Sequence, residues 1–132
     1  MSRGEQKTVL ITGASGGIGM ASAIYLAEKG YSVVATSRSD DRLAALKSLT
    51  AERRLPISTV VMDINSDEAV NSVLPGVLTE HGGVDALINN AGYSLWGPGE
   101  SLSIGELRDV FETNFSAAFR MMQGVLPGMT ER

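Results

Sequence analysis

The sequence contains no cysteine and a single histidine, His81. Without cysteine there can be neither disulfides nor thiolate metal ligands, and one histidine is too few for a histidine-based centre. We therefore expect no metal site, and we interpret His81 as a solvent-facing residue at a helix end. A chain without cysteine fits a reducing compartment, so we predict a cytoplasmic location.

Long hydrophobic runs and an excess of positive charge are also missing. No segment approaches the roughly 18 apolar residues that cross a membrane, and Met1–Lys7 is too polar for a signal peptide. The 11 basic and 15 acidic residues give a formal charge of -4. Nucleic acids and anionic membranes attract clustered Lys and Arg, so we expect neither as a partner. A chain of 132 residues, 43% of them hydrophobic, suffices for one ordinary globular domain.

Four short apolar runs are rich in β-branched residues, and none alternates as a half-exposed strand does. These runs are Thr8–Thr12, Ser32–Thr36, Ser58–Met62 and Ala86–Asn90. Segments of helical character lie between them and after the last; they are Ile18–Lys29 with Gly30 as its stop, Asp41–Arg54, Ser66–His81, and a helix from Ser103 to about Leu126. The alternation of strands and helices predicts a three-layer α/β/α domain with a doubly wound parallel sheet.

Three local signals refine these helices. Pro75 should kink or split the helix that contains it. Ser103 and Glu106 match a capping box, which starts the last helix, and Pro127-Gly128 should stop it.

Glycine, in contrast, is concentrated at one place. Four glycines lie between Gly13 and Gly19, directly after the first strand and at the start of the first helix. An open α/β sheet binds ligands at the carboxyl ends of its strands, and a helix start offers unpaired N–H groups to a phosphate. Gly13 would make the tight turn, Gly17 the close approach and Gly19 the helix–strand contact. A glycine turn that merely packs helix on strand is the alternative.

Three motifs resemble those of the short-chain dehydrogenase/reductase family. Thr12-Gly13-Ala14-Ser15-Gly16-Gly17-Ile18-Gly19 resembles its TGxxxGxG motif, and Asn89-Asn90-Ala91-Gly92 resembles its NNAG motif. Val110-Phe111-Glu112-Thr113-Asn114 is similar to the segment that carries the catalytic asparagine. The resemblance implies a Rossmann-type fold, incomplete, with about four strands in the order 3-2-1-4. Residues 1–132 would then form a partial NAD(P)-binding domain.

The resemblance also implies the residues that contact the cofactor. These are Thr12, Gly13, Ala14, Ser15, Gly16, Gly17, Ile18 and Gly19 at the pyrophosphate, Ser37 and Arg38 at the adenosine ribose, Asp63 and Ile64 at the adenine, and Asn90, Ala91 and Gly92 at the ribose and nicotinamide. Ser37 stands where NAD-preferring relatives carry Asp, and Arg38 suits a 2′-phosphate, which favours NADP over NAD. Asp40 and Asp41 would weaken this field, Arg38 could instead be simply solvated, and Asp63 could instead cap a helix.

The family's reaction transfers hydride between a nicotinamide and a hydroxyl/carbonyl substrate. Of its catalytic serine, tyrosine, lysine and asparagine, only Asn114 has a counterpart here. Tyr25 and Lys29 also spell Tyr-x-x-x-Lys, but helix phase turns them away from the apolar face. We predict an NADP(H)-preferring oxidoreductase whose 132-residue chain is a fragment that binds cofactor without turnover. The alternative is a non-catalytic dinucleotide-binding or interaction module.

Partners follow from the same resemblance. The expected substrate is a small alcohol or ketone, and Tyr93–Trp96, after the NNAG motif, could line its side of the cleft or simply pack. Pairing with a second chain is possible through helix 103–126 or through the open edge of the sheet.

Overall fold

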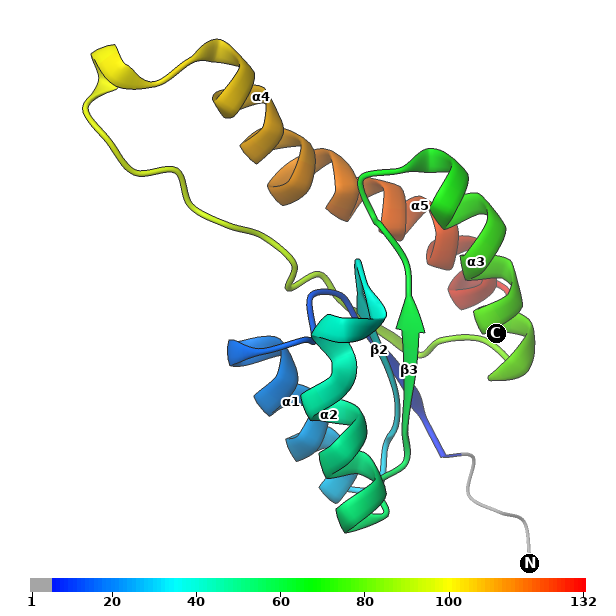
Figure 1. The fold of residues 1–132 in the computed structure, drawn as a ribbon. Coiled ribbons are helices and arrows are strands. Elements are labelled where there is room, and N and C mark those ends of the chain that lie inside the picture. The colour runs from blue at the N-terminus through cyan, green and yellow to red at the C-terminus, as the bar shows by residue number, and fades with distance from the viewer. Residues whose placement is uncertain (1–5) are drawn as a thin grey trace, which may run out of the picture.

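The fold is an open sheet of four parallel strands (Figure 1). The computed structural model describes residues 6–132, so the expectation for Met1–Lys7 lies largely outside the described residues. The strands are β1 (Thr8–Ile11), β2 (Ser32–Ser37), β3 (Ile57–Val61) and β4 (Ala86–Ile88), in the order β3-β2-β1-β4. The predicted parallel sheet and its 3-2-1-4 order are confirmed, and each strand lies within two residues of its expected bounds at either end.

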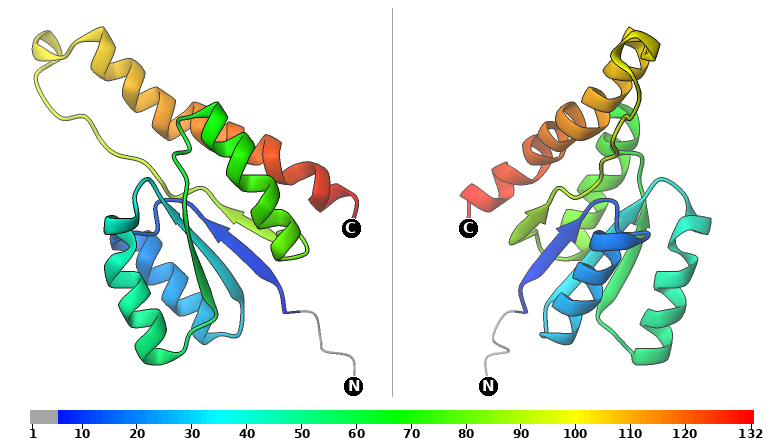
Figure 2. Two further views of the ribbon diagram at one scale, coloured as in Figure 1. Left: turned by 45° about the vertical axis from the view of Figure 1, so that its right-hand side comes forward. Right: turned by 90° about the vertical axis from the view of Figure 1, so that its left-hand side faces the viewer.

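Helices cover both faces of the sheet, as the two views of Figure 2 show. On one face, α1 (Gly17–Glu28) and α2 (Asp40–Arg53) enclose a core that includes Val33, Leu43 and Leu46. On the other, α3 (Asp67–Glu80) and the long carboxyl-terminal helix enclose a second core around Leu10, Leu74 and Met121. Successive residues of β1 alternate between the two cores, which explains why the central strands read as continuous apolar runs.

The carboxyl-terminal helix has three parts: α4 (Ile104–Phe111), the π-helical turn η2 (Glu112–Ser116) and α5 (Ala117–Thr130). The expected start is confirmed, because Ser103 accepts a hydrogen bond from the Glu106 amide while the Glu106 carboxylate accepts one from the Ser103 amide. The sequence pattern gave no sign of the π-turn. A short 3-10 helix, η1 (Gly99–Ser101), lies in the long loop before α4.

The helix stop predicted at Pro127-Gly128 is wrong, and so is a split at Pro75, while a kink at Pro75 stays a prediction. α3 is not split at Pro75, and the last helix continues through Pro127 to Thr130. Each proline is exposed, and so are Asn71 and Gln123, whose carbonyls lose their helical partners and can bond water instead. Continuing the helix past Pro127 also places Met129 against the core. Solvation and packing therefore outweigh the lost hydrogen bonds.

One face of the long helix is apolar and exposed. We call it the apolar stripe; its members are Ile104, Leu107, Phe111, Phe115, Phe119, Met122 and Leu126. In addition, β4 pairs with β1 on one side, and no other strand of residues 6–132 pairs with it. None of the helices in residues 6–132 combines the length and apolar character needed to cross a membrane.

Candidate functional site

A cavity of about 920 Å³ opens at the carboxyl ends of the strands. This volume lies within the roughly 300–1,000 Å³ typical of small-molecule and cofactor sites. The cavity brings together most of the residues predicted for the cofactor: Gly13, Ser15, Gly16, Ile18, Ser37, Arg38, Asp63, Ile64, Asn90, Ala91 and Gly92. Tyr93, which the sequence placed at the substrate side of the cleft or in simple packing, also lines it. The lining residues that the sequence interpretation missed are Thr36, Arg42, Met62, Asn65, Asp109, Glu112 and Thr113.

Three glycines of the first turn have a geometric reason to be glycine. Gly13 has φ +65°, and a Cβ built on it would lie 2.7 Å from Cα of Ala91. A Cβ on Gly19 would lie 2.4 Å from the carbonyl oxygen of Gly13. Gly17 has φ +53° and faces open space, so its backbone is accessible. The loop therefore needs bare backbone both to turn and to pack, and it leaves room beside Gly17.

The start of α1 is an uncapped helix end. No side chain of residues 6–132 bonds to its first amides, whereas Ser66 and Ser103 cap α3 and α4. The N-cap position is Gly16. Ile18, two residues further on, lines the cavity and is 79% exposed. Because the first amides of a helix have no internal partner and lie at the positive end of its dipole, this end is suited to an anion.

Thr12 and Ala14 do not line the cavity; they hold together the segments that do. The buried hydroxyl of Thr12 accepts hydrogen bonds from the amides of Asn90 and Ala91, both at 3.1 Å. The Asn90 side chain in turn donates to the carbonyls of Thr12 and Gly13, at 3.1 and 3.0 Å. Ala14 is fully buried and donates its amide to Thr36. The glycine loop and the NNAG segment therefore form one hydrogen-bonded unit.

Asn89 lies outside that unit. Its side chain donates to the carbonyl of Ala118 on α5, at 3.2 Å. Strand β4 is thereby attached to the helix that covers it.

Two arginines stand at one end of the cavity. Arg38 follows β2 directly, and Arg42 lies four residues further on, in the first turn of α2. Within residues 6–132, neither guanidinium has an ion-pair partner, while the Asp40 carboxylate pairs with Lys47. That pairing reduces the weakening effect expected of Asp40. Nothing in the sequence singled out Arg42, because only the fold places the start of α2 beside the cavity.

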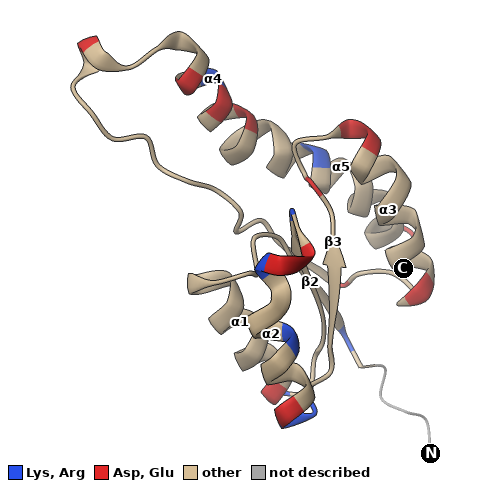
Figure 3. Ribbon diagram, in the orientation of Figure 1, with Lys and Arg blue, Asp and Glu red and all other residues tan. Residues whose placement is uncertain are grey.

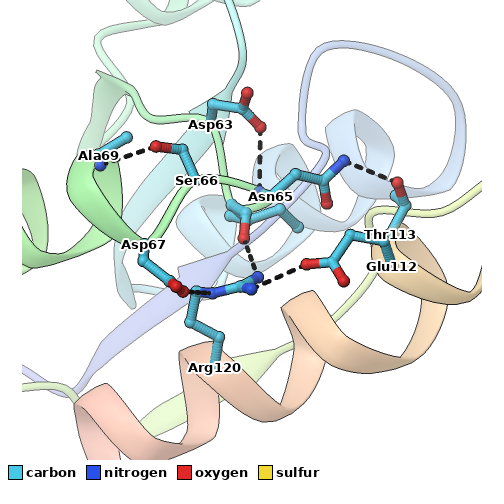
Figure 4. A network of polar contacts seen from close by, with 9 residues as sticks. Asp63, Asn65, Ser66, Asp67, Ala69, Glu112, Thr113 and Arg120 are labelled. Atoms are coloured by element: carbon cyan, nitrogen blue, oxygen red, sulfur yellow. Dashed lines mark hydrogen bonds and ion pairs between the residues drawn. The ribbon is translucent and has the colours of Figure 1, made fainter. Parts of the chain in front are cut away.

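The β3–α3 loop, which follows the strand next to β2, also lines the cavity. Asp63 accepts a hydrogen bond from the Asn65 amide at 3.0 Å and lines the cavity, while Ile64 is buried. The helix cap is supplied by Ser66, which accepts from the Ala69 amide (Figure 4). Asp63 therefore does not cap α3, which was its alternative role.

Asn114 lies in the π-turn and faces the loop after the NNAG motif. Its side-chain oxygen accepts from the Tyr93 amide at 3.0 Å, and its side-chain nitrogen donates to the Tyr93 carbonyl at 2.8 Å. The side-chain amide is thus engaged on both sides. A π-turn also breaks the i→i+4 pattern, here through a bond from the Ala117 amide to the Glu112 carbonyl, and such turns are frequent at functional sites.

A second missed residue, Arg120 on α5, joins the walls of the cavity (Figure 4). It pairs with the carboxylates of Asp67 and Glu112 and donates to the Ile64 carbonyl at 2.7 Å. The hydrogen bond to Glu112 raises the pKa of Arg120, so the guanidinium stays charged. Figure 3 shows the acidic residues on α4 and at the start of α3, with a basic segment of α5 between them.

Tyr25 and Lys29 are far from any such role. Tyr25 is 60% exposed on the outer side of α1, and Lys29 lies over its ring. The small residues Gly19, Ala23 and Ala27 form the buried side of that helix, as predicted. His81 ends α3 as expected, but it is half-buried rather than fully solvent-facing.

Two buried side-chain oxygens at this site have no hydrogen-bond partner among the residues that the structure describes. They are Thr36 Oγ1 and Asn65 Oδ1, both on residues that line the cavity. Together with the glycine cradle and the uncapped helix end, they fit an extended, polar, phosphorylated ligand. The fold and this site define the class: a dinucleotide-binding α/β protein.

Comparison with known proteins gives the family. The short chain dehydrogenase family profile matches residues 7–132. Human retinol dehydrogenase 8 is 43% identical over 130 residues, covering 96% of this chain and 41% of the relative. The 3-oxoacyl-[acyl-carrier-protein] reductase FabG of Vibrio cholerae is 34% identical over 128 residues, covering 97% of this chain and 51% of the relative. The chain belongs to the short-chain dehydrogenase family and spans about half the length of these relatives.

Solved structures agree with this assignment. An actinorhodin polyketide ketoreductase variant with NADPH superposes with a TM-score of 0.91 at 30% identity, covering 100% of this chain and 51% of that one. A metagenomic short-chain oxidoreductase in complex with NADP superposes with a TM-score of 0.87 at 29% identity, covering 95% and 57%. Members of this family are oxidoreductases that act on alcohol and carbonyl groups.

Proposed function

We propose that this chain is the cofactor-binding part of an NADP(H)-preferring oxidoreductase that acts on a small hydroxyl or carbonyl substrate. The observation that carries the proposal is the uncapped start of α1 beside the glycine loop, with Arg38 and Arg42 at the same cavity. Relatives whose names state NADP use, such as the NADP-dependent 3-hydroxy acid dehydrogenase of Salmonella typhi at 34% identity, support it.

Each part of the cofactor has a matching group in the cavity. The amides at Gly16–Ile18 would hold the pyrophosphate, and Arg38 with Arg42 would hold the 2′-phosphate through charge-assisted hydrogen bonds. Asp63 and the Ile64 backbone would contact the adenine. Asn90, Ala91 and Gly92 would border the nicotinamide end, where Thr12 fixes their position.

When bound, the nicotinamide supplies or accepts hydride at the substrate carbon. Asn114 would hold a water in the proton path to the substrate oxygen. Because its side chain is engaged by Tyr93, the group available to that water is its main-chain carbonyl in the π-turn. Tyr93, which lines the cavity, lies beside this position.

Residues 1–132 contain one Tyr-x-x-x-Lys pair, Tyr25 and Lys29, and it lies on the outer face of α1. The proton-donating tyrosine and its lysine therefore have no counterpart at this cavity. We infer that the 132-residue chain binds cofactor but does not turn over substrate. The second candidate function is a non-catalytic dinucleotide-binding module.

Titration with NADPH and NADH tests the cofactor proposal. The one tryptophan, Trp96, is 87% exposed on the loop that follows the NNAG motif, so energy transfer from Trp96 to the dihydronicotinamide reports binding. The proposal expects saturable binding of both, with NADPH bound roughly tenfold or more tightly, as one extra charge-assisted contact would give. Equal affinity would contradict the NADP preference, and no binding would contradict the whole proposal.

A turnover assay tests the lack of turnover that both candidate functions share. Neither candidate expects the purified 132-residue chain to reduce a panel of aldehydes and ketones with NADPH. Reduction at rates of 1 per second or more, the range of roughly 1–10³ s⁻¹ typical of enzymes, would contradict the inferred lack of turnover and exclude the non-catalytic module.

A further inference from the structure

Two walls of the cavity are joined by direct side-chain contacts. One wall is the β3–α3 loop at Asp63–Asn65, and the other is the π-turn at Glu112–Ser116. The loop and the turn are far apart in the sequence, yet Figure 4 shows them side by side, linked through Arg120. The Arg120 side chain is only 20% exposed, so its contacts are largely shielded from water.

Arg120 connects three elements at once. One nitrogen donates to the Ile64 carbonyl at 2.7 Å, a second pairs with Glu112 at 2.8 Å, and the third pairs with Asp67 at the start of α3. Glu112 opens the π-turn and Arg120 follows its end, so their ion pair spans the irregular turn. The planar guanidinium supplies three donors in fixed directions, which a lysine ammonium on a flexible stem cannot reproduce.

A second link runs in parallel. The Asn65 side chain donates to Thr113 Oγ1 at 2.8 Å, and the Asn65 amide donates to Asp63 at 3.0 Å. Thr113 is followed by Asn114, whose side chain holds the Tyr93 main chain on both sides. An unbroken series of contacts therefore leads from Asp63, at the adenine end, to Tyr93, at the nicotinamide end.

We propose that Arg120, with Asn65, is a positioning residue that fixes the π-turn to the β3–α3 loop and so sets the position of Asn114. Arg120 itself touches no reacting atom. The inference on positioning stands on the protein alone. Its consequence, that a ligand at the adenine end steadies the Asn114–Tyr93 contact, rests on the proposed function.

Amide hydrogen exchange at Tyr93 tests the positioning role, because that amide is held by Asn114 Oδ1. In the full chain without ligand, we expect Arg120→Met and Asn65→Ala to speed the exchange of the Tyr93 amide about tenfold. Each variant removes hydrogen bonds that hold the π-turn, and the loss of about one such bond gives an effect of this size. Arg120→Lys should give partial rescue. Gln123→Met, on the same helix but outside the network, is the matched control and should change nothing.

The amides of β1 separate positioning from general stability. The proposal expects them to keep their slow exchange in Asn65→Ala and Arg120→Lys while Tyr93 speeds up. If Tyr93 and β1 accelerate together in all variants, or if Tyr93 is unchanged in them, the proposal is overturned. Arg120→Met removes the most contacts. If that variant unfolds, Asn65→Ala and Arg120→Lys decide the outcome.

The ligand arm uses 2′,5′-ADP, which carries the adenine and 2′-phosphate but no nicotinamide. In the unaltered chain it should bind and slow the exchange of the Tyr93 amide several-fold; in Asn65→Ala and Arg120→Lys it should bind with a smaller effect on that amide. Binding with equal slowing in all variants would contradict the coupling alone. Absence of binding would contradict the proposed function and, with it, the coupling, while the ligand-free result on positioning would stand.

Discussion

At the scale of single residues, the cavity depends on two guanidinium groups and three bare backbones. Arg38 and Arg42 present two planar donor forks in the same part of the cavity, and neither is neutralised within residues 6–132. Planar forks bind phosphate bidentately, whereas a free 2′-hydroxyl gains little from them. The proposed preference for NADP over NAD therefore depends on single residues.

The first prediction concerns these arginines. Arg38→Ala and Arg42→Ala should each weaken NADPH binding roughly 10- to 100-fold and leave NADH binding nearly unchanged, since a hydrogen bond to a charged group is worth about 1.5–3 kcal/mol. Titration by Trp96 energy transfer measures both. Arg53→Ala is the matched control, because Arg53 lies at the other end of α2 and pairs with Glu28. An unchanged ratio of the two affinities in Arg38→Ala would refute its phosphate role.

The second prediction concerns the glycine loop. Gly19→Ala should lower the free energy of unfolding by about 2 kcal/mol or more, because its Cβ would lie 2.4 Å from the Gly13 carbonyl. Gly16→Ser should stay within about 0.5 kcal/mol, because Gly16 is extended, open and at a position that favours serine. Urea denaturation compares the two. Equal effects would show that the packing reason given for Gly19 is wrong.

At the scale of elements, the helix starts are where sequence and structure agree most closely. The Ser103 amide and hydroxyl both donate to the Glu106 carboxylate, which lowers the pKa of Glu106. A group whose pKa is depressed on folding contributes stability above its unfolded pKa and loses it as the pH falls through the folded value. The capping box therefore stabilises the start of α4 at neutral pH and loses this effect in acid.

The third prediction follows from that sign. As the pH falls below the ordinary glutamate range of about 4.3, the first turn of α4 should fray while the sheet stays intact. An NMR titration should place the Glu106 pKa below the ordinary glutamate value of about 4.3. Ser103→Ala should return it toward the ordinary value. A Glu106 pKa that does not respond to Ser103→Ala would disprove the capping-box account.

Sequence patterns predicted the strands and their order because buried parallel strands and capping residues are local, chemically distinct signals. Pro75 and Pro127 misled because their cost depends on whether the freed carbonyl faces water, which is a tertiary property. The π-turn at Glu112–Ser116 left no local signal either, since it is held by contacts to Asn65 and Tyr93 from distant segments. The glycine and NNAG motifs were readable as contiguous strings; Arg42 and Arg120 became visible only through their spatial neighbours.

At the scale of the whole molecule, two surfaces stand uncovered. The apolar stripe on α4–α5 includes Phe115, which is 70% exposed, and β4 has a free edge within residues 6–132. Contiguous exposed apolar surface and open sheet edges both favour association. These are the two surfaces through which pairing with a second chain was expected from the sequence.

The fourth prediction is that the 132-residue chain self-associates as its concentration rises. The double variant Phe115→Glu with Phe119→Glu should shift sedimentation toward the monomer, because charge on the stripe opposes burial. Tyr25→Glu, which alters a similarly exposed aromatic on the opposite side of the sheet, is the control and should have no such effect. If both variants and the unaltered chain sediment alike, the stripe does not drive association.

The most direct test of the central idea follows the backbone amides of Gly16, Gly17 and Ile18 by NMR during an NADPH titration. If the open helix end holds the pyrophosphate, these signals move furthest and saturate with the dissociation constant measured at Trp96. Saturable binding of NADPH with those three amides unmoved would contradict the account.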